Sequence, residues 1–322
     1  MRRRRLKLNA SEEEAYYHCI SRTAGGEWLF GEREKEVLRS QVWKLAEYCG
    51  LEIVTYVVMS NHYHVLVRVP RRREVADREL LGRYRALYPR LKPAQEIALK
   101  AVEADMAKNG DLARAWREKQ LRQMFDVSQF NKLLKMRFSI WYNQTHKRYG
   151  TLWSERFKST LVQTGDALRK MAAYIDGNAL RAGIIKDSKD YRFCGYAEAV
   201  AGNQKARRGL QQVVGGSWSE GMAGYRCLLI AMLSEAREGK AQATPELFEE
   251  VLRTGGKLPL AEVLKCRIRY FTDGVILGSK EYVERTALKI DGRTNRRAYP
   301  LAPITDWGDL HVLSRMRSNL WG

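Results

Sequence analysis

The sequence predicts an α+β fold in which an antiparallel sheet carries helices on one face. Three observations lead to this prediction. The first 70 residues alternate between strand-type and helix-type segments as strand, helix, strand, strand, the first half of a split β-α-β arrangement. A second long helix and a fourth strand follow downstream and complete the pattern. Between the two halves lies a charged, helix-forming stretch, about 71–126, which we expect to be a helical insert.

The strands are expected where β-branched and aromatic residues cluster between turn residues. Ala15–Arg22 is rich in aromatic residues and is followed by the Gly25-Gly26 pair. Two further runs are joined by a polar turn, and a fourth run follows the second long helix. These three strands are predicted at Leu51–Val58, His62–Val69 and Arg156–Val162.

The helices are expected where apolar residues recur with a period near 3.6 and charged residues occupy the opposite side. The three predicted helices span Glu32–Cys49, Gln129–Arg148 and Gly165–Ala182. Gly50 and Gly183 directly follow two of them, and glycine is common just beyond a helix end.

The third strand carries the residues on which the functional prediction depends. Because strand side chains alternate between faces, His62 and His64 lie on one face, roughly 6–7 Å apart at Cα. Two imidazoles on one face suit a divalent metal whose further ligands come from elsewhere. The alternative is a pair of surface histidines at a sheet edge. His18, in the first strand, is either a ligand or a core histidine, and we favour a structural or DNA-facing role.

The charge of the chain indicates a polyanionic partner. Its 322 residues include 57 Lys and Arg against 37 Asp and Glu, a net charge of +20. Such an excess is typical of nucleic-acid-binding proteins, although a ribosome-associated or membrane-surface protein is an alternative. At the start of the chain we expect a phosphate-contacting arm, or equally a solvated tail, formed by Arg2, Arg3, Arg4 and Arg5.

The composition also indicates the cellular compartment in which the protein is expected. The sequence has no run of about 18 apolar residues and no apolar region near its start, so neither a membrane span nor a secretory signal is expected. The five cysteines are scattered without a CxxC pair, which favours a reducing compartment and argues against a zinc site. We expect a cytoplasmic, nucleoid-associated protein.

A basic segment interleaved with aromatic residues lies between the second long helix and the fourth strand, at 146–158. Cations can meet phosphates while rings stack on unpaired bases, so this segment suits nucleic acid. The alternative is an ordinary loop packed on Trp153. The candidate DNA-binding residues here and nearby are Arg22, Lys147, Arg148, Trp153, Arg156, Lys158 and Arg181.

The last of the three helices presents a second set of chemical groups. Tyr174, Asn178 and Arg181 fall at i, i+4 and i+7 and therefore share one face. A tyrosine hydroxyl is a weak nucleophile, so it needs a metal or a cation beside it. Taken alone, a tyrosine on a helix is more often a packing residue.

Three motifs, in this order, resemble the Y1 tyrosine transposases of the insertion-sequence-200 type. They are MSNHYHVLV at 59–67, LWSERFK at 152–158 and AAYIDGNALRAGII at 172–185. The resemblance is strongest to the REP-associated tyrosine transposases, the branch associated with repetitive extragenic palindromes, within the HUH endonuclease superfamily. It covers about Ala15–Ile185, interrupted by the insert.

The resemblance implies a ferredoxin-like fold whose sheet presents two histidines to a tyrosine helix. By matching, His62, His64 and Asn178 are ligands of a divalent metal, Mg²⁺ or Mn²⁺, and Tyr174 is the nucleophile. The family's tyrosine attacks a phosphodiester of single-stranded DNA and leaves a 5′-phosphotyrosine link and a free 3′-hydroxyl, and the reverse step rejoins strands. The implied partner is hairpin-containing single-stranded DNA, bound by a monomer or a homodimer.

The chain departs from the family pattern within the tyrosine motif. Where the family commonly has a histidine, a bulky residue and a proline, this chain has Asp176, Gly177 and Ala179. A glycine inside a helix costs roughly 1 kcal/mol relative to alanine. We expect Asp176 either to add a carboxylate near the metal or to face solvent.

The remaining sequence is divided by composition. Residues 1–201 form the predicted catalytic domain, 202–243 a linker, and 244–322 a helical region that is a candidate for DNA binding. Two helices are expected at Leu260–Phe271 and Ser279–Leu288, either as a helix-turn-helix-like DNA reader or as a helical cover for the catalytic domain.

The sequence therefore predicts metal-dependent cleavage of single-stranded DNA and strand transfer at REP-like hairpins. The main alternative is a DNA- or RNA-binding protein that has the same fold and has lost catalysis. A nickase of replication or conjugation with similar histidine chemistry is a second alternative, which the single helix tyrosine argues against.

Overall fold

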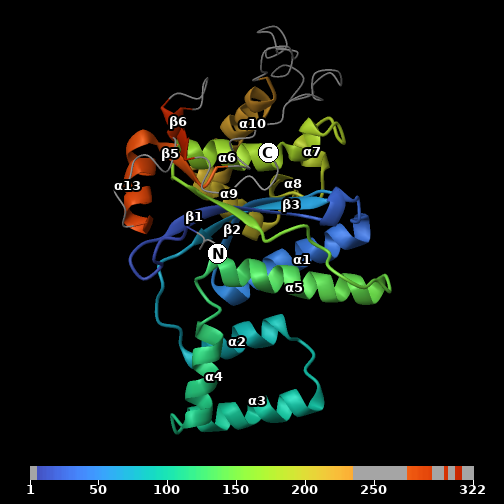
Figure 1. Cartoon of the computed structure of the whole chain (residues 1–322), viewed down its shortest axis with the longest axis vertical. Helices are drawn as coiled ribbons and strands as arrows, with labels where there is room; N and C mark the ends of the chain where they lie inside the picture. Colours follow the sequence, from blue (N-terminus) through green and yellow to red (C-terminus); the bar gives the residue numbers. More distant parts are fainter. Residues whose placement is uncertain (1–5, 235–273, 292–300, 304–308, 314–322) are drawn as a thin grey trace.

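The computed structural model describes residues 6–234, 274–291, 301–303 and 309–313. A seven-stranded sheet, in the order β2-β3-β1-β4-β5-β7-β6, runs through the middle of the molecule (Figure 1). The four strands from the first half of the chain are β1 Ala15–Arg22, β2 Glu52–Val58, β3 His62–Val69 and β4 Lys158–Val162. All the pairings among these four strands are antiparallel.

These four strands and two helices form the predicted split β-α-β unit. Helix α1 (Glu32–Cys49) connects β1 to β2, and α5 (Val127–Thr145) precedes β4. The strand order β2-β3-β1-β4 is that of a ferredoxin-like fold, so this part of the prediction is confirmed. Asp126 caps α5 by accepting hydrogen bonds from the backbone amides of the first turn, and Gly50 ends α1 with φ +67°.

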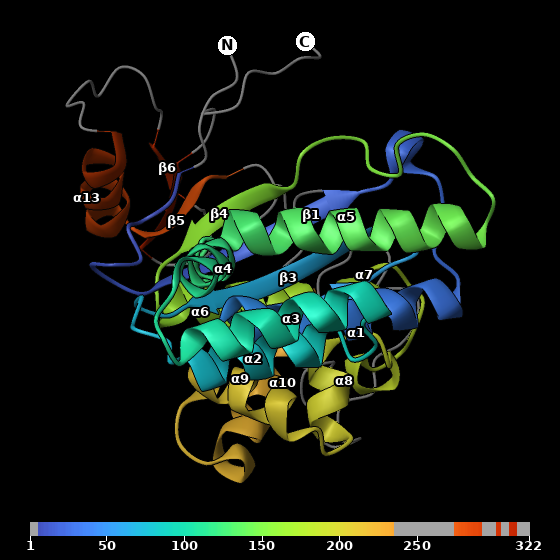
Figure 2. The same cartoon turned by 90° about the horizontal axis from the view of Figure 1, so that it is seen from below.

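The sheet is covered on both faces, whereas the sequence predicted helices on one. Tyr63, in β3, points to the α5 side, where its hydroxyl donates to Asn131 Oδ1 at 3.2 Å. Its neighbours His62 and His64 face the other side, which is covered by α6 (Asp166–Asp176), α8 (Gly195–Val200) and α9 (Gln204–Val214). Figure 1 shows the two layers, with α1 and α5 on one side of the sheet and α6 on the other, and Figure 2, seen from below, looks onto α1 and α5. A buried strand face on each side accounts for the near-continuous burial of β2 and β3.

The stretch between β3 and α5 is a helical insert, as predicted. It consists of three helices, α2 (Asp77–Leu87), α3 (Pro93–Met106) and α4 (Asp111–Leu121). Figure 1 shows it projecting from the α1 and α5 side, away from the sheet. Tyr48, on α1, joins it to the core by donating a hydrogen bond to Gln120 Oε1 at 2.6 Å.

Two expectations for the second half of the chain are corrected. The stretch predicted to be a linker contains α9 and α10 (Trp218–Ser234), because Ala206, Leu210 and Val213 give α9 an apolar face that is buried in the core. The extension predicted to be helical also adds strands β5 (Ile276–Ser279), β6 (Leu301–Pro303) and β7 (Leu310–Leu313) to the sheet.

Of the two C-terminal helices that the sequence predicts, one is confirmed. Helix α13 (Lys280–Asp291) occupies the second, whereas 260–271 lies outside the described residues. The N-terminal Arg2–Arg5 also lies outside them. Within the described part of the chain, none of the helices combines the length and the apolar character that a membrane crossing needs.

A buried carboxylate joins α6 to the layer around it. Asp176, the last residue of α6, is fully buried, so it does not face solvent as one expectation had it. It accepts hydrogen bonds from Thr55 Oγ1 at 2.6 Å, the Tyr225 hydroxyl at 2.6 Å and the Tyr196 amide at 3.1 Å. Burial raises the pKa of Asp176 to about 7, although the three hydrogen bonds oppose this shift.

Asp176 should make stability depend on pH. Its pKa rises from a usual 3.8 to about 7 on folding, so the folded state binds a proton that the unfolded state has lost. The free energy of unfolding of the wild type should therefore fall as pH rises from about 4 to 7, by up to the order of 4 kcal/mol. Urea denaturation across this range, compared with Asp176→Asn, isolates the effect, because the amide does not titrate. A constant difference between the two proteins at every pH would contradict this assignment.

Candidate active site

Three histidines and a tyrosine meet between the sheet and α6. The His18 and His64 rings are stacked with centroids 5.0 Å apart, and the His62 ring lies edge-on to His64 at 5.1 Å. The Tyr174 ring lies 5.7 Å from His64 and 6.3 Å from His18. The structure therefore brings together the predicted nucleophile and both predicted histidine ligands.

The register of β1 against β3 explains this cluster. His62 is paired with Arg22, and His64 with Ile20, so these side chains point to the same face of the sheet. His18 lies two positions further along β1, on that face, diagonal to His64. A shift of one residue in this pairing would turn the β3 histidines to the α5 side.

Each β3 histidine has one ring nitrogen occupied by a neighbouring side chain. His62 Nδ1 lies 2.6 Å from Asn61 Oδ1, and His64 Nδ1 lies 2.7 Å from His18 Nε2. Histidines that bind metals commonly use one nitrogen for the metal and the other for a hydrogen bond that fixes the ring. Each of these two rings is therefore held in a fixed orientation through one nitrogen.

His64 is held in its neutral form. Its pKa is well below the usual 6.5, first because the ring is buried and then because His18, His62, Arg181 and Arg22 add positive charge around it. A neutral imidazole is the form that coordinates a metal. The nearby arginines also make the surroundings electropositive, which suits a phosphate group.

Arg181 fixes the position of Tyr174. Its guanidinium carbon lies 4.3 Å from the centre of the Tyr174 ring, and Nη2 donates to the Tyr174 carbonyl. Helix α6 ends at Asp176, and a short helix, α7 (Asn178–Arg181), begins after Gly177, so the single helix predicted over 165–182 is interrupted. A Cβ at Gly177 would lie 3.0 Å from Arg181 Nη1 and from the Ala173 carbonyl oxygen, so glycine leaves room for this arginine.

The third predicted ligand comes from the short helix that follows α6. Asn178 is partly exposed at the start of α7, and no described contact joins it to the histidines. Among the described residues, no group of three or more His, Cys, Asp or Glu side chains is arranged to hold a metal ion. The groups that the structure brings together here are imidazoles, those of His62, His64 and His18.

Apart from Arg181, which lies against Tyr174, the described basic residues predicted to bind DNA fall into two groups. Arg22 and Lys158 lie on the histidine face, because Arg22 is paired with His62 and Lys158 with Ile20. The others, Lys147, Arg148 and Arg156, lie in the segment between α5 and β4, where Lys147 and Arg156 are exposed and Arg148 is half-buried. An isolated bridge between Thr23 and Trp153 ties this segment to the end of β1.

Trp153 is a core residue, as the alternative reading of this segment had it. Its side chain is 7% exposed and packs edge-on against Tyr63 and Phe30 on the α5 side of the sheet. Its indole nitrogen donates to Ser139 Oγ at 2.8 Å. Stacking on a base is therefore not available to Trp153. The exposed ring of the segment is Tyr149, which is 95% exposed.

The sequence left open what two residues, Asn61 and His18, contribute to the site. Asn61, read only as a turn residue, contacts His62 through Oδ1 and donates through Nδ2 to the Gly26 carbonyl at 2.9 Å. His18 was given a structural or DNA-facing role, and the structure shows which of them it has: it contacts His64 inside the protein. Positions 18 and 22 of β1 are an even number of residues apart, so their side chains lie on the same face of the sheet. Once β1 and β3 are taken as neighbours, this spacing places His18 on the face of the β3 histidines.

Comparison with known proteins bears on the first part of the chain. Residues 11–87 match the family model described as transposase, IS200-like. The predicted resemblance to these transposases is confirmed over this segment. It includes β1, β3 and all three clustered histidines, but not Tyr174.

Two further comparisons were made, with proteins of curated function and with solved structures. No protein of curated function matches the sequence. Among solved structures, the chain is similar to a REP-associated tyrosine transposase bound to a REP hairpin, at 14% identity and a TM-score of 0.36. That match covers 63% of this chain and 86% of the other. The likeness to these transposases therefore rests on residues 11–87, the segment that matches the family model.

The two roles considered for Trp153 predict different results. Trp153→Ala should lower the free energy of unfolding by about 3–5 kcal/mol, because it removes a buried aromatic side chain. Tyr149→Ala, in the same segment, should change it by less than about 0.5 kcal/mol. Chemical denaturation measures both values. A Trp153→Ala protein as stable as the wild type would instead favour the base-stacking role.

Proposed function

We propose that this protein is a Y1 transposase that cleaves and rejoins single-stranded DNA through Tyr174. The observation that carries the proposal is the meeting of Tyr174 with His62 and His64 between α6 and the sheet. The match of residues 11–87 to the IS200-like transposases supports the reaction class. The net charge of +20 supports a DNA substrate, for which we propose REP-like hairpins.

In this reaction the Tyr174 oxygen would attack a backbone phosphorus. A bond forms between that oxygen and phosphorus while the hydroxyl proton of Tyr174 is lost to solvent. The bond from phosphorus to the 3′ oxygen breaks, and the 3′ oxygen takes up a proton from solvent, so no net proton is consumed. The phosphotyrosine ester keeps the energy of the original bond, so that a 3′-hydroxyl can later reverse the step. Arg181, held against the Tyr174 ring, would keep the nucleophile in place and add positive charge beside the phosphate.

A divalent ion, Mg²⁺ or Mn²⁺, fits the donor set of His62 and His64, with Asn178 proposed as third ligand. Bound there, it would polarise the scissile phosphate and stabilise the charge that develops on it. The chain's own contribution is to hold both rings in one orientation through Asn61 and His18. Arg22 and Lys158, on the same face, are proposed to position the DNA strand.

The proposed chemistry predicts a covalent protein–DNA adduct. Wild-type protein incubated with Mn²⁺ and a labelled single-stranded hairpin should form a band that survives denaturing electrophoresis. Tyr174→Phe should abolish it, because the ring is retained and the nucleophilic oxygen is lost. His62→Ala should reduce it at least a hundredfold, which is typical when a catalytic metal ligand is removed.

The matched control is Tyr149→Phe, the same change at an exposed tyrosine, which should leave the adduct intact. Tight DNA binding without an adduct, by wild type and Tyr174→Phe alike, would replace the proposal with the binding-protein alternative. An adduct that persists in Tyr174→Phe would assign the nucleophile elsewhere.

The contact between His18 and His64 predicts a second effect. His18→Phe keeps a ring of similar size but removes the nitrogen that holds His64 Nδ1. Mn²⁺ affinity, measured by titration calorimetry without DNA, should fall by about 10–100-fold, the usual cost of losing such a supporting contact. His311→Phe, at a strand histidine in β7, should have no effect. Equal Mn²⁺ affinity in wild type and His18→Phe would show that His18 serves packing alone.

A further inference from the structure

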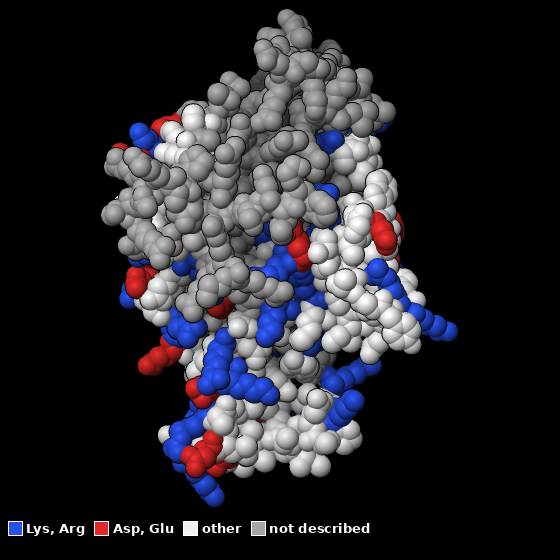
Figure 3. All heavy atoms as spheres, in the orientation of Figure 1, with Lys and Arg blue, Asp and Glu red and all other residues white. Residues whose placement is uncertain are grey.

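A basic cleft lies far from the candidate active site, between the insert and α9. Its volume is about 770 Å³, within the range of ligand-binding clefts. Five cations and two carboxylates contribute to its lining. Figure 3 shows Lys and Arg side chains spread over one face of the molecule, in keeping with its net charge of +20.

The cleft and the histidine cluster are at opposite ends of β3. His62 begins this strand, and Pro70, which lines the cleft, directly follows its last residue. At about 3.3 Å per residue, the two ends are roughly 25 Å apart. A group bound in the cleft would therefore not touch Tyr174, and the cleft is a separate site.

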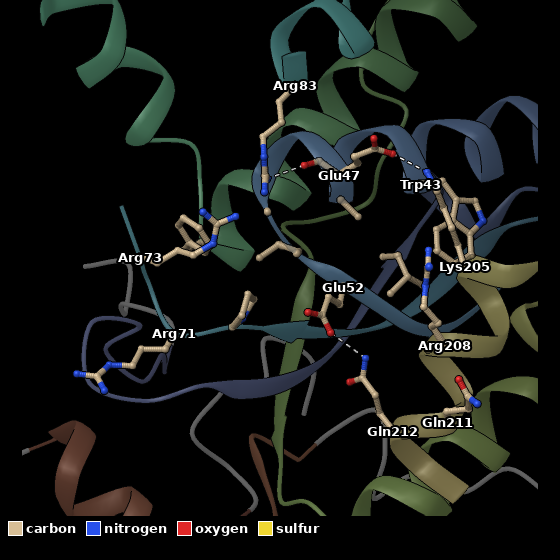
Figure 4. Close-up of a pocket in the computed structure, with 17 residues that line it drawn as sticks. Trp43, Glu47, Glu52, Arg71, Arg73, Arg83, Lys205, Arg208, Gln211 and Gln212 are labelled. Carbon is tan, nitrogen blue, oxygen red and sulfur yellow. Dashed lines mark hydrogen bonds and ion pairs between the residues drawn. The ribbon is translucent and has the colours of Figure 1, made fainter. Parts of the chain in front are cut away.

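Each wall of the cleft carries two cations that point inward. Arg73 and Arg83 come from the insert side, and Lys205 and Arg208 come from α9 (Figure 4). The aromatic ring of Trp43 lies beside the α9 pair, and its orientation is fixed by a hydrogen bond from its indole nitrogen to Glu198 at 2.9 Å.

Positive charge remains in the cleft after the described ion pairs are counted. Lys205 pairs with Glu47 at 2.6 Å, and Glu52 pairs with Arg68 at 2.9 Å. On the insert wall, Arg73 and Arg83 share the single carboxylate of Glu79, at 2.6 and 2.7 Å. Arg208 is exposed, and within the described residues no carboxylate is paired with it.

Two glycines bring the walls of the cleft close together. A Cβ at Gly209 would lie 2.2 Å from the Ile53 carbonyl oxygen, so only glycine lets α9 pack this closely on β2. A Cβ at Gly50, where φ is +67°, would lie 2.8 Å from Arg83 Nη1. Arg83 Nη1 also donates to the Glu47 carbonyl at the end of α1, at 2.7 Å. The positions of both basic walls are thus fixed by backbone packing.

We propose that this cleft is a second DNA contact, which binds phosphates of single-stranded DNA outside the stretch held at Tyr174. Converging guanidinium and ammonium groups beside an aromatic ring and the amides of Gln211 and Gln212 are the groups that single-stranded nucleic acid requires. The identity of the polymer rests on the proposed function, whereas the anionic character of the ligand rests on the cleft alone.

The test removes one cation from each wall. Arg73→Ala with Arg208→Ala leaves the Glu79–Arg83 and Glu47–Lys205 pairs in place, and both arginines are exposed, so the fold should be kept, as a thermal melt would check. The control, Lys100→Ala with Lys108→Ala, removes the same charge from exposed positions in and after α3. All proteins carry Tyr174→Phe, so that binding is measured without cleavage.

Binding of a fluorescent 30-nucleotide single strand is followed by anisotropy across a range of salt concentrations. Each phosphate contact to a single strand contributes about 0.7 to the slope of log affinity against log salt, so the cleft variant should lose about 1.4 from this slope. Its affinity should fall to the same extent for unrelated sequences. The lysine control should keep the slope of the parent protein, and equal slopes in both double variants would overturn the proposal.

Crosslinking then locates the contact. A strand that contains 5-iodouracil should crosslink to a peptide from the cleft, such as the one that carries Trp43. Crosslinks confined to 146–158 would also overturn the proposal that the cleft binds DNA. Displacement of the strand from the cleft by equimolar AMP would overturn it too, because the cleft would then bind a mononucleotide as well as it binds the strand. If no adduct forms but the cleft variant still loses salt dependence, the proposed chemistry is rejected and the cleft remains a DNA contact. If the adduct forms but the cleft variant keeps the slope of the parent protein, the cleft proposal is rejected and the chemistry stands.

Discussion

The antiparallel pairing of β1 with β3 is the constraint on which the candidate site depends. It places His18, His62 and His64 on one face and leaves Tyr63, between the last two, to pack against α5. Because strand side chains alternate, the same register makes one face chemically active and the other a core. Helix α6 then needs only to lie across the active face for Tyr174 to meet the histidines.

Much of this arrangement was predictable because it depends on local patterns. The bounds of β1, α1 and β3 match those expected, since turn residues and helix-ending glycines delimit them clearly. The meeting of Tyr174 with the β3 histidines followed from a family resemblance, not from spacing. The environments of Trp153 and Asp176 could not be read from sequence, because each depends on partners far along the chain: Tyr63 for Trp153, and Tyr225 for Asp176.

The departures from the family motif have a structural explanation in this fold. Asp176 is turned away from solvent and joins α6 to β2 and to the helices that follow. Gly177 makes room for Arg181 to lie over the Tyr174 ring. Both residues thus support the position of the tyrosine helix, so their presence is compatible with an intact site.

The second half of the chain was the least predictable, because its apolar helix faces and short strands are buried only against the completed sheet.

The parallel pairing of β4 with β5 has a consequence for the integrity of the protein. Strand β4 is flanked by β1 on one side and by β5, more than a hundred residues later in the chain, on the other. A chain that ended after α10 would leave the backbone amides and carbonyls along one side of β4 without a strand partner. Such an exposed edge is a template for pairing with another molecule. Proteolytic loss of the C-terminal strands would therefore favour self-association of an otherwise folded core.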